Sequence, residues 1–514
     1  MHPSIVARQA PDRIALRMAG SGLTLTYGEL ESRSNQLAQL FRSLGMRSGD
    51  VIAIMVENHP RYFEICWAAQ RSGLLFTPLS TRLTETEAAY IVNDSGAKLF
   101  IGSRAFADVA GRIIPLTPKV HHRFMLDDAL EGHASLEAAA ARMPAEPIPD
   151  QSAGGDMLYS SGTTGRPKGV RVLPESDDIA YVTSPTRLCA SRWGMGTDTV
   201  YLSPGPLYHS APLRFSMRAM ILGGTVVVME HFDPVEFLRN ISQYRVTHTQ
   251  VVPTMFVRLL KLDAATRAAA DVSSLRCAIH AAAPCPVSVK EDMIAWWGPI
   301  LWEYYSGTEG MGMTMCDSYQ WLSHKGTVGQ SVMGRARICD EEGRELPAGE
   351  IGLVYFSDGK AFKYHNDPEK TAAARNALGW TTIGDIGYLD ADAFLYLTDR
   401  KSFMIISGGV NIYPQESENV LVGHPQVMDA AVFGVPDADM GEAVKAVVQP
   451  RDMAAAGPGL ADELIAYCRD RLAHYKCPRT VDFMAELPRS PSGKLYKRVL
   501  RDRYWEDHGQ QRVA

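Results

Sequence analysis

The chain has 514 residues, a length that allows two or more domains. Its 46% hydrophobic and 21% charged residues are typical of a soluble globular protein. The net charge of −6, with lysine and arginine scattered along the chain, excludes the basic footprint of a nucleic-acid-binding protein, so no nucleic-acid partner is expected.

The N-terminal segment Met1–Leu25 mixes arginine and aspartate into its apolar residues, and no run of 18 apolar residues occurs in the chain. We therefore expect neither a signal peptide nor a transmembrane segment. The eight cysteines form no Cys-x-x-Cys pair, which argues against a zinc ribbon. Their apolar neighbours predict reduced core thiols in a cytoplasmic protein.

Short apolar runs alternate with amphipathic stretches up to about residue 400. The runs that predict buried strands are Val51–Met55, Leu99–Gly102, Thr225–Met229 and Thr249–Val252. A helix is predicted after Asp233, an N-cap acid followed by a proline and then a glutamate in the first turn. This alternation predicts an α/β fold with layered, largely parallel sheets.

The segment from Tyr159 to Gly169 reads Tyr-Ser-Ser-Gly-Thr-Thr-Gly-Arg-Pro-Lys-Gly. Glycines let backbone N–H groups turn toward a polyphosphate, and hydroxyls and a lysine can bind its remaining oxygens. The spacing is not that of a Walker A loop, because a proline precedes the lysine and a glycine follows it. The residues expected to bind phosphate are Ser160, Ser161, Gly162, Thr163, Thr164, Gly165 and Lys168.

This loop resembles that of the acyl-adenylate-forming superfamily, which includes acyl-CoA synthetases, luciferases and the adenylation domains of peptide synthetases. The resemblance covers essentially the whole chain, because further family segments follow in the same order. It implies a large N-terminal domain of layered sheets and helices, residues 1–400, that binds ATP and an acid. It also implies a small, mobile α+β C-terminal domain, residues 401–514. The implied activity is ATP- and Mg²⁺-dependent activation of a carboxylic acid through an acyl-adenylate, with release of pyrophosphate.

The segment Leu207–Pro212 resembles the family segment beside the carboxylate of the acid, and His209 matches the histidine of many acyl- and aryl-CoA synthetases. A packed loop histidine is the alternative reading. No aspartate stands in this segment to pair with an amino group, which argues against an α-amino acid. Small residues and adaptable methionines suit a medium-sized aromatic, cyclic or long acyl acid. The expected pocket wall comprises Leu213, Ala281, Gly307, Met311 and Met313.

Two further segments are expected to bind the nucleotide. His280–Pro284 resembles the small-residue strand end that lies beside adenine in the family, and it supplies Ala281 and Ala282. Tyr304–Gly310 resembles the aromatic-x-x-Thr-Glu segment, and it includes Tyr304, Ser306 and Gly307. The resemblance implies that Tyr305 stacks on adenine, that Thr308 binds the α-phosphate, and that Glu309 holds Mg²⁺ through oxygen.

The segment Trp380–Gly387 resembles the Thr-Gly-Asp segment of the family, although Ile383 replaces the usual threonine. The resemblance implies that Asp385 accepts hydrogen bonds from both ribose hydroxyls. It also implies that Arg400, fifteen residues on, reaches the ribose; a solvated salt bridge is the alternative for this arginine.

The last part of the chain is predicted to form a small α+β unit. Its expected strands are Ala430–Val435, Ala443–Gln449 and Val481–Met484, its expected helix is Asp462–His474, and Ala454–Gly459 is expected to be a surface loop. The polar segment Asp399–Ser402 suits a hinge between domains. Ser402 and Phe403 depart from the charged residues that are usual there.

Two segments of this unit are expected to act at successive steps. Ile405–Pro414 predicts a strand and a Gly-Gly turn, and by resemblance Gly408 and Gly409 line a tunnel for the phosphopantetheine arm of CoA. Leu487–Leu495 resembles the terminal Gly-Lys motif. Lys494 would then bridge the two anions that approach when the carboxylate attacks the α-phosphate. The expected catalytic residues are Lys494, His209, Thr308 and Glu309.

The sequence leaves the acyl acceptor open, as it does the natural acid and the oligomeric state. CoA is preferred, because the Gly-Gly segment is intact and no carrier domain is attached. A free amine, as in an amide bond synthetase, is the second hypothesis. The third is a carrier-protein ligase or a non-catalytic binding protein, and the intact Lys494, Glu309 and Asp385 argue against the non-catalytic version.

Overall fold

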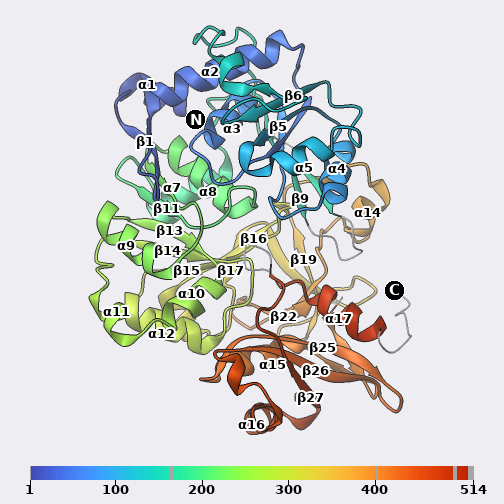
Figure 1. Ribbon diagram of the computed structural model, residues 1–514. Helices are drawn as coiled ribbons and strands as arrows, with labels where there is room; N and C mark the ends of the chain where they lie inside the picture. The colour runs from blue at the N-terminus through green and yellow to red at the C-terminus, as the bar shows by residue number, and fades with distance from the viewer. Residues whose placement is uncertain (1, 161–166, 173, 401–402, 490–494, 507–514) are drawn as a thin grey trace.

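The computed structural model describes residues 2–160, 167–172, 174–400, 403–489 and 495–506 (Figure 1). The large domain contains two sheets with mainly parallel strands, two small antiparallel sheets and most of the helices. The small domain follows residue 402 and lies at the bottom of the view, against one side of the large domain.

The first large sheet has nine strands in the order β17-β16-β15-β14-β13-β11-β12-β1-β2 among the described residues. Its inner strands β1 and β11–β15 are parallel, whereas β2, β16 and β17 run antiparallel to their neighbours. The strands are β1 (Ile14–Met18), β2 (Thr24–Thr26), β11 (Val200–Ser203), β12 (Thr225–Val228), β13 (His248–Val251), β14 (Cys277–His280), β15 (Leu301–Tyr305), β16 (Met313–Asp317) and β17 (Gln330–Met333).

The second large sheet has six parallel strands in the order β7-β6-β5-β3-β4-β8 within the part of the chain that is described. They are β3 (Val51–Met55), β4 (Leu75–Pro78), β5 (Ala97–Ser103), β6 (His122–Leu126), β7 (Ala134–Ser135) and β8 (Gly155–Asp156). All five residues of β3 are buried, as expected for a strand covered on both faces. The expected strands at 51–55, 99–102, 225–229 and 249–252 are confirmed to within a residue or two by β3, β5, β12 and β13.

Two antiparallel sheets lie between these large sheets and the small domain. The first contains β9 (Leu158–Ser160), β10 (Lys168–Val172) and β20 (Phe362–Tyr364). The second contains β18 (Arg335–Cys339), β19 (Gly352–Ser357), β21 (Asp385–Leu389) and β22 (Leu395–Arg400). Their apolar faces share one core cluster, which includes Val170, Val354, Phe356 and Leu395.

The helices cover the large sheets, as Figure 1 shows. In chain order they are α1 (Pro3–Gln9), α2 (Tyr27–Ser43), α3 (Tyr62–Arg71), α4 (Glu85–Asp94), α5 (Ala107–Arg112), α6 (Leu136–Ala140), α7 (Ser184–Trp193), α8 (Ser210–Ile221), α9 (Pro234–Tyr244), α10 (Pro253–Leu260), α11 (Ala264–Ala269), α12 (Val287–Trp297), α13 (Ser318–Ser323) and α14 (Pro368–Ala373). The predicted start of α9 is confirmed, because the Asp233 carboxylate accepts from the amides of Val235 and Glu236.

The small domain is built on a sheet with the order β24-β23-β26-β25, to which β27 adds beside β26. Its elements are β23 (Ile405–Ser407), β24 (Val410–Ile412), α15 (Pro414–Val422), β25 (Val427–Asp437), β26 (Gly441–Pro450), α16 (Pro458–Arg469), β27 (Thr480–Phe483) and α17 (Lys497–Glu506). The expected α+β unit and its three strands are confirmed. The expected Gly-Gly turn is also present, since Gly408 and Gly409 join β23 to β24 with positive φ.

The predicted helix Asp462–His474 was wrong at both ends. The helix α16 begins at Pro458, because a proline fits the first turn, where its missing N–H costs no hydrogen bond. It ends at Arg469, and the chain then forms a short 3₁₀ turn at His474–Lys476. The expected loop at 454–459 is correspondingly shorter. The expected hinge at 399–402 begins on β22, and residues 401 and 402, with the proposed domain boundary, lie outside the described residues.

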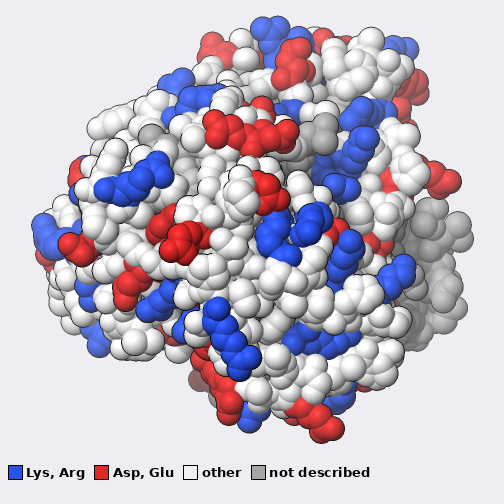
Figure 2. All heavy atoms as spheres, turned by 90° about the horizontal axis from the view of Figure 1, so that it is seen from above, with Lys and Arg blue, Asp and Glu red and all other residues white. Residues whose placement is uncertain are grey.

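Charged side chains of both signs are interspersed over the face of the molecule shown in Figure 2. No helix in the described ranges is long and apolar enough to cross a membrane. All eight cysteines lie in described segments, and none forms a disulfide; seven are buried and Cys285 is half-buried.

Candidate active site

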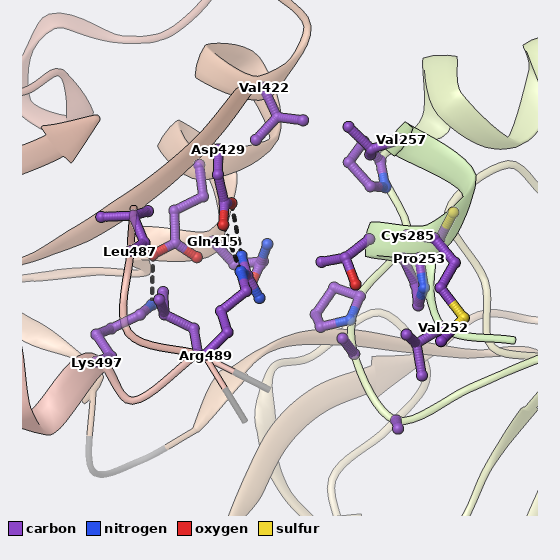
Figure 3. A pocket seen from close by; sticks show the side chains of 18 of the residues that line it. Val252, Pro253, Val257, Cys285, Gln415, Val422, Asp429, Leu487, Arg489 and Lys497 are labelled. Atoms are coloured by element: carbon purple, nitrogen blue, oxygen red, sulfur yellow. Dashed lines mark hydrogen bonds and ion pairs between the residues drawn. The ribbon is translucent and has the colours of Figure 1, made fainter. Parts of the chain in front are cut away.

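A cavity of about 1240 Å³ lies between the large and small domains. From the large domain it is bordered by the segments that follow the carboxyl ends of β11, β13, β14 and β15, where ligands bind in open α/β sheets. Figure 3 shows its far part, where Val252, Pro253 and Val257 of the large domain face Val422, Asp429 and Arg489 of the small domain. The cavity is therefore a cleft that both domains form.

Many of the expected site residues border this one cavity. They are Ser160, Lys168, Ala282, Tyr304, Tyr305, Ser306, Gly307, Thr308, Glu309 and Asp385. Ser160 and Lys168 are register partners in the β9–β10 hairpin. Ser161, Gly162, Thr163, Thr164, Gly165 and Lys494 lie outside the described residues. Arg400 is the backbone partner of Asp385 across β21 and β22, which places the two positions side by side.

The carboxylate of Glu309 is buried at the bottom of the cavity. The Tyr364 hydroxyl donates a hydrogen bond of 3.0 Å to its Oε1 atom. The Lys168 ammonium lies 5.0 Å from the centre of the same Tyr364 ring. Tyr364, on β20, thus holds the expected metal ligand and the expected phosphate-binding lysine near each other.

The carboxylate of Asp385 faces the aromatic ring expected at adenine. The Tyr305 hydroxyl donates a hydrogen bond of 2.7 Å to its Oδ2 atom. Gly307 lies close by, and a Cβ atom there would come within 2.7 Å of Glu309 Oε2 and 3.1 Å of Ile383 Cδ1. Ile383, which departs from the family pattern, therefore packs over Gly307, and a side chain at 307 would displace Glu309 or Ile383.

The strand end at 280–284 is supported by a buried ion pair. Lys290 Nζ lies 2.6 Å from Glu303 Oε2, and both side chains are almost inaccessible to solvent. Burial raises the pKa of Glu303, an effect that Lys290 opposes. His280 lies beside them, and burial lowers its pKa well below the usual value, which keeps the ring neutral at pH 7. Ala282, which borders the cavity just beyond, has a strained φ of +75°.

Arg214 joins three segments of the site and was not anticipated from the sequence. Its guanidinium binds the Asp156 carboxylate, with Nη2 2.7 Å from Oδ2, and donates through Nη1 to the Thr308 carbonyl at 3.3 Å. Asp156 lies on β8, just before the β9–β10 hairpin, and Thr308 precedes Glu309. Arg214 therefore fixes the segments expected to bind phosphate and metal against each other.

Several residues expected in the acid pocket do not border the cavity. Leu213 is fully buried in the large core cluster, because it lies one helical turn after His209 on the core-facing side of α8. Met311 is fully buried in the cluster of the antiparallel sheets, since Gly310 turns the chain inward with a φ of +66°. Met313 packs on the large core cluster from β16, and Ala281 is buried. These four side chains lie behind the wall.

His209 also lies behind the cavity wall. It is the residue before the first turn of α8, its Nε2 atom is buried, and its ring lies 4.7 Å from that of Tyr208. Tyr208 borders the cavity. His209 therefore packs against a residue of the cavity wall.

From the end of the small domain, the described residues that border the cavity are Glu486, Leu487, Arg489, Leu495 and Lys497. Arg489 binds Asp429, with Nη2 2.6 Å from Oδ1, and Lys497 Nζ lies 2.8 Å from Glu418 Oε1; Figure 3 shows both pairs. The turn with Gly408 and Gly409 does not border the cavity.

A specific contact holds the small domain in this pose. The Lys261 ammonium, at the end of α10, donates to the carbonyl of Val427 at the start of β25. Burial and then Arg451 lower the pKa of Lys261 to about 8. Val422 packs both on the core of the small domain and on the cluster around α9, α10 and α12.

Comparison with known proteins gives the family. The family described as "AMP-binding enzyme" matches residues 4–363, and "AMP-binding enzyme C-terminal domain" matches residues 416–494. A feruloyl-CoA synthase of Amycolatopsis sp is 34% identical over 97% of each chain. An o-succinylbenzoate CoA synthetase from Bacillus subtilis, solved with its acyl-adenylate intermediate, superposes with a TM-score of 0.78 at 27% identity, covering 97% of both chains.

A third similar protein is named for amide bond formation and not for thioester formation. An amide bond synthetase from Marinactinospora thermotolerans superposes with a TM-score of 0.80 at 28% identity, covering 98% of this chain and 100% of that one. The matched family segments and these similarities extend over both domains of the structure. The chain therefore belongs to the family of AMP-binding enzymes, together with acyl-CoA ligases of the acyl-adenylate-forming superfamily.

Proposed function

We propose that the protein activates a carboxylic acid with ATP, forming an acyl-adenylate and pyrophosphate, and then transfers the acyl group to CoA. The observation that carries this proposal is the convergence of Lys168, Tyr305, Glu309 and Asp385 on one cavity, although they are spread over more than 200 residues of sequence. The similarity to a feruloyl-CoA synthase over both domains supports CoA as the acceptor.

The residues present fit ATP and Mg²⁺. The Asp385 carboxylate, which now accepts from the Tyr305 hydroxyl, can accept instead from ribose hydroxyls, while the Tyr305 ring offers a face to adenine. Lys168 and Ser160 flank the loop proposed to bind the β- and γ-phosphates. Glu309 is a buried carboxylate beside this loop, and Mg²⁺ is commonly held by one or two carboxylates together with substrate phosphates. When bound, the ion would neutralise charge on the departing pyrophosphate.

The proposed mechanism requires that the acid and ATP are positioned for attack and that the negative charge on both is stabilised. An acid carboxylate oxygen attacks the α-phosphorus, and the bond to the β-phosphate oxygen breaks, so that pyrophosphate leaves. Thr308 is proposed to bind the α-phosphate, Arg400 to support Asp385 at the ribose, and Lys494 to bridge the two approaching anions. The closed cleft excludes water from the mixed anhydride.

The second step requires a rearrangement of the small domain. In the present pose Arg489, Leu495 and Lys497 border the cavity and the Gly408–Gly409 turn does not. We propose that the domain, residues 401–514, rotates about the 399–402 segment, so that Lys494 withdraws and the glycine turn lines the path of the acceptor thiol.

The amide bond synthetase neighbour makes a free amine the second candidate acceptor. A screen for pyrophosphate release across organic acids, run with CoA, with an amine and with neither, tests both steps. We expect pyrophosphate release with a subset of acids and a thioester only in the CoA arm. Product in the amine arm alone would favour the amide-forming alternative, and no pyrophosphate with any acid would reject the proposal.

Substitution of Gly409 by leucine is expected to preserve adenylation and to lower thioester formation at least tenfold. Gly409 has a φ of +80° and open space around it, so a leucine would fill the proposed path of the acceptor. Asparagine tolerates the same backbone conformation with a smaller side chain, which makes Gly409→Asn the matched control. Hydroxamate formation measures the first step and thioester formation the second. If both steps fall equally in the leucine variant, the glycine turn has a different role.

Substitution of His209 by alanine is expected to change the preference among acids. The ring supports Tyr208, which borders the cavity, so its loss lets that wall move. Relative kcat/KM values for short, aromatic and long acids provide the measurement, and His209→Phe restores the bulk without the ring nitrogens. An unchanged acid profile in both variants would assign His209 to packing alone.

We also infer a reducing, cytoplasmic location. The eight cysteines are all unpaired, and burial raises the pKa of thiols such as Cys189 (to about 11) and Cys316 (to about 12). Buried protonated thiols are typical of structural cysteines in reduced proteins.

A further inference from the structure

A cluster of hydrogen-bond donors surrounds Phe215 of α8 and reaches the cavity at Tyr304. Four side chains surround the ring of Phe215. Trp193, Tyr304 and Tyr201 have ring centres 5.3, 6.0 and 6.3 Å from it, and the Arg218 guanidinium carbon lies 5.7 Å from it. We call Trp193, Tyr201, Arg218 and Tyr304 the donor cluster.

These donors lack acceptors among the described residues. The Tyr201 hydroxyl and the Trp193 indole N–H are buried, with side chains 0% and 5% exposed, and neither has a hydrogen-bond partner there. The described chain also offers no hydrogen bond or ion pair to the half-buried Arg218 guanidinium or to the Tyr304 hydroxyl. Buried polar groups are almost always hydrogen-bonded, so the two buried donors, Trp193 and Tyr201, need an acceptor that the described chain does not supply, and Arg218 and Tyr304 add two half-buried donors beside them.

The chemistry of the cluster selects the kind of acceptor. Burial raises the pKa of Tyr201 well above its usual value and that of Tyr304 to about 12, so both hydroxyls stay protonated and can donate. The indole and the guanidinium can only donate. The walls are aromatic. An oxygen acceptor on a ring or a short apolar chain fits, whereas a cation does not.

The position of the cluster connects it to the proposed reaction. Tyr304 borders the cavity, follows Glu303 on β15 and immediately precedes Tyr305. Arg218 lies one turn after Arg214 on α8, and Arg214 contacts Thr308 at the proposed α-phosphate site. Tyr304 is the member of the donor cluster that borders the cavity, and Trp193, Tyr201 and Arg218 lie behind it. An acid whose carboxylate lies near Thr308 can therefore direct its far end toward Tyr304, with the other three donors beyond that ring.

We propose that the donor cluster recognises an oxygen acceptor at the far end of the acid, so that the substrate is a cyclic or aromatic acid with a distal carbonyl, phenol, ether or carboxylate oxygen. This inference rests on the proposed function. The names of two relatives fit it, since feruloyl and o-succinylbenzoyl groups both carry oxygen away from the reacting carboxylate.

Pairs of acids that differ only in the distal oxygen test the inference. Cinnamate against 4-hydroxy- and 4-methoxycinnamate, and 3-cyclohexylpropanoate against its 4-oxo derivative, are compared by pyrophosphate release with ATP. We expect the oxygen-bearing member of at least one pair to have a kcat/KM about tenfold higher, as one or two buried hydrogen bonds predict. Equal values in every pair would overturn the inference, whereas no pyrophosphate with any acid would reject the proposed function itself.

Variants locate the effect in the cluster. Tyr201→Phe and Arg218→Met should each bring the ratio of kcat/KM, oxygen-bearing acid to oxygen-free acid, close to one. Arg218→Lys should retain part of the preference. Arg192→Met is the matched control, because Arg192 is exposed on α7 beside Trp193, and its ratio should equal that of the wild type. A ratio that survives in Tyr201→Phe and Arg218→Met would place recognition elsewhere.

Thermal unfolding separates an acid from bound water as the partner of Tyr201. Removal of a hydroxyl without an acceptor should leave the Tm of the acid-free protein unchanged or raise it, whereas removal of a water-bonded hydroxyl should lower it. We expect Tyr201→Phe to keep its Tm without acid and to lose the additional stabilisation by the oxygen-bearing acid. A lowered Tm in the acid-free variant would contradict an acid-binding role.

Discussion

Replacement of Lys494 by alanine is expected to lower the rate of adenylation by about 10² or more, which corresponds to roughly 3 kcal/mol in the barrier. The carboxylate and the α-phosphate repel each other as they approach, and a cation that touches both removes this repulsion in a cleft from which water is excluded. The pose of the structure supports the role, because residues 489 and 495 on either side of the Lys494 segment border the cavity. Hydroxamate formed from acid, ATP and hydroxylamine measures the rate.

The control for this variant is Lys363→Ala, since Lys363 is an exposed lysine on β20 and its removal changes the net charge equally. Thioester formation from pre-formed acyl-adenylate should stay near the wild-type rate in Lys494→Ala, because that step does not use this cation. Wild-type adenylation by Lys494→Ala would refute its catalytic role.

Replacement of Arg214 by methionine is expected to have the second largest effect. The guanidinium makes a forked interaction with Asp156 and a hydrogen bond to the Thr308 carbonyl, and both partners are largely buried. Methionine fills similar volume but leaves the Asp156 carboxylate unpaired. We expect a loss of about 2 kcal/mol in the free energy of unfolding and a decrease of about 10²-fold in kcat/KM for ATP.

A double-mutant cycle isolates the pair. Asp156→Asn combined with Arg214→Met should cost clearly less than the sum of the single changes, because the unpaired charge is gone. Arg214→Lys keeps the charge without the fork and should be intermediate in ATP–pyrophosphate exchange. The role would be contradicted if the two single substitutions had strictly additive effects. A wild-type rate of ATP–pyrophosphate exchange in Arg214→Met would also show that this arginine does not position the Thr308–Glu309 segment.

The elements that could be predicted from the sequence have strong local signals. The strand β3 is a continuous apolar run, α9 begins with an N-cap acid and a proline, and the β23–β24 turn contains two adjacent glycines. The helix α16 was misplaced, because the proline that begins it lies in a segment that reads as a loop. Residue propensity alone could not decide whether this proline begins a helix or belongs to a loop, because glycines and alanines flank it.

The motif residues of the site could be predicted, but their supports could not. Arg214 meets Asp156 across 58 residues of sequence, and Tyr364 meets Glu309 across 55. Nothing in the sequence near any of these residues predicts its partner, because each interaction forms only after β8, α8, β15 and β20 have packed. The acid pocket was predicted least well. Leu213 and Met311 were expected at its wall, whereas helix phase and a glycine turn direct both into the core.

The central claim is that a carboxylate oxygen of the acid becomes bonded to the α-phosphorus of ATP in this cavity. It is tested most directly with an acid labelled with oxygen-18 in its carboxylate, ATP, Mg²⁺ and CoA, followed by mass spectrometry of the nucleotide product. We expect one labelled oxygen in AMP, together with unlabelled pyrophosphate. Label in inorganic phosphate with formation of ADP, or unlabelled AMP alongside the thioester, would contradict an acyl-adenylate.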